Sequence, residues 1–77
     1  MGADIYISTR ILADTNYYNN TRLRAVNKNG TWESVSEYVG DNVVQFNIDN
    51  SGQIQYITST AFPGFTSCIF RYKVLTN

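Results

Sequence analysis

The sequence predicts a small all-β protein, an antiparallel β-sandwich or a partly open barrel of about six strands. Apolar and polar residues alternate over short segments, and Asn, Gly and Pro gather between these segments. Aromatic residues make up 14% of the chain and most of them are Tyr, which favours strands over helices. A length of 77 residues allows one domain, so residues 1–77 are expected to fold together.

The first half of the chain predicts three strands. Residues 5–12 carry apolar side chains on both faces, so both faces are expected to be covered. Residues 13–20 are rich in Asn and predict a loop. Strands are predicted at 21–27 and 32–39, joined by a hairpin at Asn29-Gly30.

The second half predicts three more strands, at 43–49, 53–60 and 65–75, separated by turns at 40–42, 50–52 and 61–64. Because the connections are short, each strand is expected to pair with its neighbour in sequence. Alternation places these side chains inward: Val44, Phe46, Ile48, Cys68, Phe70, Tyr72 and Val74, with Ser67, Arg71 and Lys73 outward.

The chain lacks the cross-links and metal sites that usually stabilise a small fold. It has no His and a single Cys, Cys68, so an internal disulfide and a structural zinc site are both excluded. A domain of this size buries only about 60 to 65% of its unfolded surface. We therefore expect the chain to complete its core by forming a homo-oligomer, for which a two-fold dimer is the default.

Charge and hydropathy exclude several classes of partner. Six basic and six acidic residues give a formal charge of zero, whereas proteins that bind nucleic acid or acidic membranes carry an excess of basic residues. No apolar run approaches the roughly 20 residues of a membrane span, and Met1 to Asp4 does not resemble a signal peptide. We therefore expect a soluble protein that neither binds nucleic acid nor inserts into a membrane.

Catalytic and metal sites are also not expected. Cys68 lies on the apolar face of its predicted strand, where a thiol acts as a small core hydrophobe, and no His is present as its base. Glu33 and Glu37 are roughly 13 Å apart in a strand, too far for the common glycosidase geometries. Residues 47–54 resemble the start of a calcium loop, but a β-turn explains them and Thr58 replaces the final Glu. The protein is expected to be no enzyme and to need no cofactor.

Aromatic and amide side chains occur together in the predicted loops. Tyr rings stack on sugars and amides bond sugar hydroxyls, although the same residues also suit a subunit interface or local core. The candidate ligand-binding residues are Tyr17, Tyr18, Asn19 and Asn20 in the first loop and Phe62 and Phe65 around the Pro-Gly turn.

Residues 32–73 resemble a pattern near the carboxyl ends of phage and large-virus tail-fibre proteins. The pattern comprises a Trp strand, a Gly-Asp turn, a strand ending in a Ser-Gly hairpin, a Gln/Tyr strand and a final Arg/Tyr strand. Its motifs are Val39-Gly40-Asp41-Asn42, Phe46-Asn47-Ile48, Ser51 to Tyr56, Ser59 and Ile69 to Lys73. The resemblance implies a virion location and a parallel trimer whose tip binds host-surface glycans or proteins, which places a trimer ahead of a dimer.

Two functions therefore compete. The first is a non-enzymatic structural and adhesive module, a homotrimer of viral fibre type that binds a host receptor. The second is a monomeric, lectin-like carbohydrate-binding domain that uses residues 17–20 or the turn at 62–65. The oligomeric state separates them.

Overall fold

The computed structural model describes residues 2–58 and 61–76, which form six strands and no helix, so the all-β prediction is confirmed. Within these residues there is accordingly no helix of the length and hydropathy that a membrane crossing requires. The strands are β1 (Gly2–Leu12), β2 (Tyr17–Lys28), β3 (Thr31–Gly40), β4 (Gln45–Ile48), β5 (Ile54–Ile57) and β6 (Ser67–Thr76).

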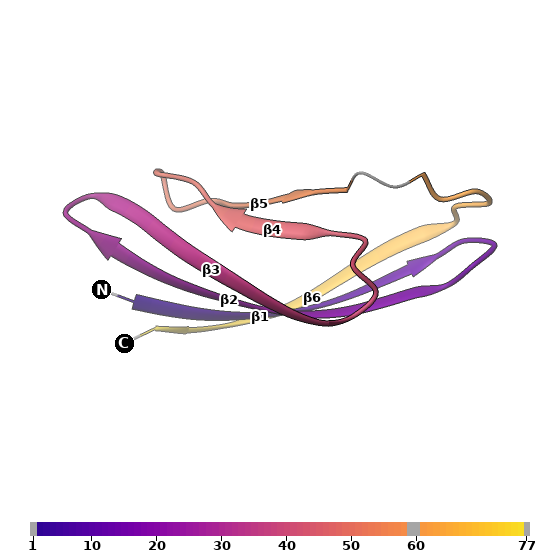
Figure 1. Ribbon diagram of the computed structural model, residues 1–77, viewed down its shortest axis with the longest axis horizontal. Helices are drawn as coiled ribbons and strands as arrows, with labels where there is room; N and C mark the ends of the chain where they lie inside the picture. Colours follow the sequence, from indigo (N-terminus) through magenta and orange to yellow (C-terminus); the bar gives the residue numbers. More distant parts are fainter. Residues whose placement is uncertain (1, 59–60, 77) are drawn as a thin grey trace.

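The strands form two antiparallel sheets. A four-stranded sheet has the order β3-β2-β1-β6, and β4 and β5 form a separate hairpin. Figure 1 shows the long, curved sheet with this hairpin above one of its faces. The molecule is elongated, measuring 44 × 19 × 16 Å.

Neighbour-to-neighbour pairing is confirmed for β1–β2, β2–β3 and β4–β5 but is wrong for β3–β4 and for β5–β6. β6 pairs with β1, in a register that runs from Ala3 opposite Thr76 to Leu12 opposite Ser67. The eleven-residue β1 presents a long row of backbone donors and acceptors. β5 has four residues and would satisfy only part of that row, whereas the ten-residue β6 matches it.

The hydrophobic core lies between the sheet and the hairpin. We call the sheet face beneath the hairpin the inner face and the opposite one the outer face. Side chains that stand directly opposite each other in an antiparallel pair share a face. The core consists of Ile5, Ile7, Leu23, Val44 and Phe46, with Ile48 and Phe70 packed against it, which confirms the inward positions predicted at Val44, Phe46 and Ile48.

Only the inner face of β1 is covered. Tyr6, on its outer face, is 41% exposed, so within one chain the expectation that both faces of this strand are covered is wrong. The hairpin is a single layer on one side, and no described element lies over the outer face.

The turns predicted at Asn29-Gly30 and at Pro63-Gly64 are present. Asn29 and Gly30 both have positive φ, 56° and 87°, as a two-residue type I′ hairpin requires. In the Pro63-Gly64 turn, the amide of Phe65 donates to the carbonyl oxygen of Phe62 at 3.1 Å.

Several strand boundaries differ from the prediction. β2 begins at Tyr17, so residues 17–20 belong to a strand and not to a loop. They pair with β1 from Ile11 to Ser8, and this pairing outweighs the local preference of Asn for turns. β5 ends at Ile57, and the Ser59 and Thr60 of its predicted span lie outside the described residues.

Candidate functional site

The six predicted ligand-binding residues do not form one site. Because residues 17–20 lie in a strand, their side chains alternate between the two faces of the sheet. Tyr17 is on the inner side, where its ring meets that of Phe62 edge to face with centroids 5.5 Å apart. Tyr18 and Asn20 are on the outer face, and Phe65 is 54% exposed in its turn.

Asn19 has a structural position. It is 2% exposed, its Nδ2 donates to the carbonyl oxygen of Asp41 at 2.7 Å, and its Oδ1 accepts from Thr21 Oγ1 at 2.6 Å. The Asp41 carboxylate in turn accepts from the amide of Tyr18 at 2.9 Å. These bonds fasten the chain after β3 to the start of β2, so Asn19 is not free to bind a ligand.

Replacing Asn19 with alanine is expected to lower the free energy of unfolding by about 1 to 3 kcal/mol. The change leaves the buried Thr21 hydroxyl and the Asp41 carbonyl oxygen without their bonding partner. The matched control is Asn20→Ala at the next, exposed position, with a change within about 0.5 kcal/mol. Urea denaturation of both variants checks this, and equal losses would contradict the structural role of Asn19.

The segment that resembles a calcium loop is a hydrogen-bonded turn. Asp49 Oδ1 accepts from the amide and hydroxyl of Ser51, at 3.0 and 2.7 Å, and from the amide of Gln53 at 2.9 Å. The hydroxyl of Ser51 and the amide of Gln53 lower the pKa of Asp49 by stabilising its carboxylate. The β-turn interpretation of these residues is therefore confirmed.

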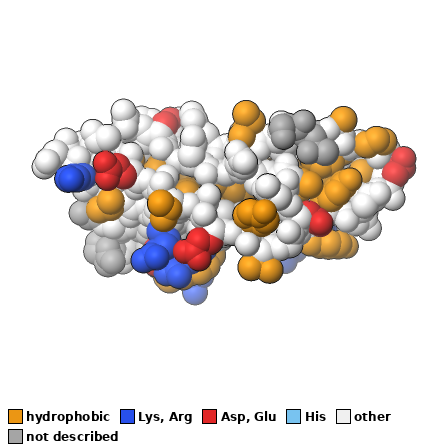
Figure 2. Space-filling view, viewed as in Figure 1, with side chains coloured by type: hydrophobic (Ala, Val, Ile, Leu, Met, Phe, Trp, Pro, Cys, Tyr) orange, Lys and Arg blue, Asp and Glu red, His pale blue; other side chains and the backbone are white. Residues whose placement is uncertain are grey.

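The basic side chains gather on the outer face. The strand registers place all six there, together with Asp4, Glu33 and Glu37, so six positive minus three negative charges leave +3 on this face. In Figure 2 most of the basic side chains that are visible lie along the lower edge, away from the hairpin. The six are Arg10, Arg22, Arg24, Lys28, Arg71 and Lys73.

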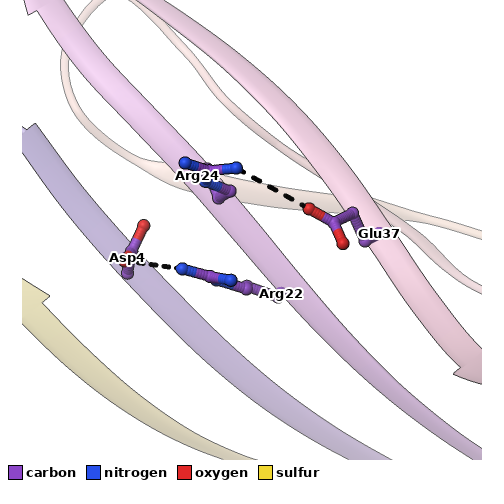
Figure 3. A network of polar contacts seen from close by, with 4 residues as sticks. All are labelled: Asp4, Arg22, Arg24 and Glu37. Carbon is purple, nitrogen blue, oxygen red and sulfur yellow. Dashed lines mark hydrogen bonds and ion pairs between the residues drawn. The ribbon is translucent and has the colours of Figure 1, made fainter.

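Part of this face is ion-paired. Arg22 Nη2 lies 3.1 Å from Asp4 Oδ2, and Arg24 Nη1 lies 4.0 Å from Glu37 Oε1 (Figure 3). The hydrogen bond to Asp4 raises the pKa of Arg22, whose guanidinium also sits 5.6 Å from the ring centroid of Tyr6. Both pairs are largely solvated and add little stability, but they neutralise this part of the face.

Among the described residues, the basic side chains elsewhere on the outer face are not neutralised by ion pairs of this kind. Arg10, Arg71 and Lys73 make no ion pair within the described part of the chain. Arg10 lines a depression of about 500 Å³ and Lys73 an adjoining one of about 580 Å³, and both depressions are lined by Ser8, Asn20, Val39 and Arg71. The ion-paired Arg22 and Glu37 also line the larger depression. We call this surface the cationic groove and define it by Tyr6, Ser8, Arg10, Tyr18, Asn20, Arg71 and Lys73.

The sequence predicts two residues of the cationic groove, Tyr18 and Asn20, but not the gathering of its charges. A net charge of zero conceals the segregation of charge between the faces. The available signal was the spacing of two between Arg71 and Lys73, because such residues share a strand face. Their grouping with Arg10 depends on the β1–β6 pairing, which no local pattern in the sequence predicts.

A second surface is apolar. Tyr56 of β5 and Phe70, Tyr72 and Val74 of β6 form what we call the apolar strip, on the side of β6 that faces the hairpin. The Tyr56 and Phe70 rings meet with centroids 5.0 Å apart, yet Tyr56, Tyr72 and Val74 are 61, 72 and 44% exposed. Each strand of the strip has one hydrogen-bonded neighbour, so one edge of each is open in the described structure.

The side chains of β6 that the sequence predicts to point inward do lie on the inner face, but those near the end of the strand are not buried. Tyr72 and Val74 share the face of Ile7 and Ile5, but the hairpin does not cover them. The prediction that Cys68 is a core residue is also wrong, because its side chain is exposed at the start of this edge strand. Partial desolvation still raises the pKa of the Cys68 thiol, which disfavours the reactive thiolate.

Comparison of the chain with protein-family models, curated proteins and solved structures found no match. The cationic groove and the apolar strip are therefore the features from which a function can be inferred.

Proposed function

We propose that this protein is a non-enzymatic structural and adhesive module that assembles with copies of itself and presents a surface to a receptor. The observation that carries the proposal is the apolar strip beside the open edges of β5 and β6. The resemblance to tail-fibre proteins adds the oligomeric state, a trimer, and the setting, a viral fibre with a host-surface receptor.

The distribution of apolar side chains supports assembly. Among the described residues, nine hydrophobic side chains are buried and thirteen large ones are exposed. Burying one large apolar side chain stabilises the folded state by about 1.5 to 3 kcal/mol. A chain whose apolar strip stays in water lacks this stabilisation. An open strand edge next to apolar side chains is also a template for another strand. A second copy of the chain satisfies both requirements at once.

Assembly is tested by the mass of the folded protein in solution. Sedimentation equilibrium of the 8.7 kDa chain at micromolar concentration is expected to give a trimer. Tyr72→Lys places a charge in the strip and is expected to reduce the mass to that of one chain. Tyr18→Lys is the matched control, since Tyr18 is 55% exposed on the outer face, and it is expected to leave the mass unchanged.

A folded monomer whose melting temperature does not vary with dilution would refute the assembly. That result would favour the competing lectin-like monomer. Such a lectin could not use residues 17–20 as one site, because their side chains point to opposite faces. It would have to use the exposed Phe65 and the turn at Pro63.

A further inference from the structure

We infer that the cationic groove binds an anionic polysaccharide, a sugar chain that carries repeated sulfate or carboxylate groups. The inference deepens the proposed adhesive function and rests on it, because it names the chemical class of the receptor and the surface that binds it. It concerns the outer face, whereas the proposed assembly uses the apolar strip.

The arrangement of the charges favours an extended ligand. Arg71 and Lys73 are two residues apart on one face of β6, a separation of roughly 6.5 to 7 Å. Arg10 stands opposite Ile69, diagonally from Arg71, at about 7 to 8 Å between backbones. The three cations therefore follow a line. A small anion would reach one or two of them, whereas a chain of anions would engage all three.

The uncharged side chains of the groove suit sugars. The Tyr18 ring is 55% exposed and offers an apolar face for the C–H surface of a pyranose. Asn20 and Ser8 lie between this ring and Arg71, and their amide and hydroxyl groups can donate to and accept from sugar hydroxyls. The two arginines add bidentate donors that match carboxylate and sulfate oxygens.

The charge of the outer face is unlike that of a nucleic-acid interface. A nucleic acid carries a charge on every nucleotide, and proteins that bind it have a strongly basic surface. Here Asp4, Glu33 and Glu37 share the outer face with the cations, and the chain as a whole is neutral. These carboxylates would repel a phosphate backbone laid across the whole sheet, whereas the groove combines its cations with the exposed Tyr18 ring and the Asn20 amide, which suit a sugar chain.

Binding is tested by fluorescence anisotropy with labelled heparin and labelled polygalacturonate, which separate sulfate from carboxylate recognition. We expect at least one of them to bind, with an affinity that falls as salt rises, and neutral dextran not to bind. The double variant Arg10→Gln with Arg71→Gln is expected to weaken binding at least tenfold. Arg24→Gln with Lys28→Gln removes the same charge from the same face outside the groove, and a change below twofold is expected.

Several results would overturn the inference. The inference would be wrong if neither anionic polysaccharide bound, or if the two double variants lost equal affinity. It would also be wrong if single-stranded RNA bound more tightly than both polysaccharides. Circular dichroism of every variant establishes that each is folded. Sedimentation of wild type under the same conditions separates this inference from assembly, because a monomer that binds through Arg10 and Arg71 would refute only the assembly.

Discussion

Replacing Gly40 with alanine is expected to lower the free energy of unfolding by about 3 kcal/mol or more. Gly40 ends β3 with a φ of 101°, in a region that costs other residues about 1 to 3 kcal/mol. A Cβ at this position would also collide with the carbonyl oxygen of Tyr18 and approach its carbonyl carbon to 3.3 Å. These atoms are backbone within β2, so no side-chain rotation relieves the contact. Movement of the strand would break the bond from the Asp41 amide to the same oxygen, which is 2.9 Å long.

Gly30→Ala is the matched control for this prediction. Gly30 also has positive φ, 87°, but a Cβ there would have no atom within 4 Å. Its expected loss is therefore the backbone cost alone, about 1 to 2 kcal/mol. Urea denaturation at one fixed protein concentration compares the two variants, because an assembling protein gains stability with concentration. Equal losses would show that the approach of β3 to Tyr18 contributes nothing.

Replacing Phe46 with alanine is expected to cost about 3 to 5 kcal/mol, the range for a buried Phe. Phe46 is 8% exposed and belongs to the cluster with Ile5, Ile7 and Leu23. It also meets Phe70 edge to face, with ring centroids 5.6 Å apart. A two-stranded hairpin is at best marginal in water alone, so β4 and β5 depend on this packing. We expect the hairpin of the variant to detach from the sheet and the free energy of unfolding of the whole protein to fall.

Asn47→Ala is the control, because this exposed neighbour lies on the opposite face of β4 and is expected to change stability by less than about 0.5 kcal/mol. Unfolding in urea gives the two free energies. Hydrogen exchange then resolves the hairpin, with amides of residues 45–48 and 54–57 expected to exchange faster in Phe46→Ala. Unchanged protection there, in a protein of wild-type stability, would contradict the proposed role of the ring.

The parts of the fold that the sequence predicts are local. Alternation over residues 44–48 identifies two members of the core, Val44 and Phe46, and Asn29-Gly30 identifies a hairpin. The pairing of β6 with β1 joins residues more than fifty positions apart, and no local pattern encodes it. Residues 17–20 have the composition of a loop, but β1 and Asp41 supply the bonds that make them a strand.

The candidate site was only partly predictable for the same reason. Tyr18 and Asn20 were recognised by residue type, and both line the cationic groove. Asn19 has the same side chain as Asn20, yet it is buried because strand alternation turns it inward. Arg10 and Arg71 become neighbours only through the β1–β6 register.

The adjacency of β1 and β6 has a consequence for engineering. Ala3 stands opposite Thr76, so the chain enters and leaves the domain at one pole of a molecule 44 Å long (Figure 1). A polypeptide with this arrangement can be grafted into a surface loop of a carrier without stretching the insertion point. Circular permutation has the same basis, since a brief linker would bridge the original ends while new ones are opened at the exposed Asn29-Gly30 tip.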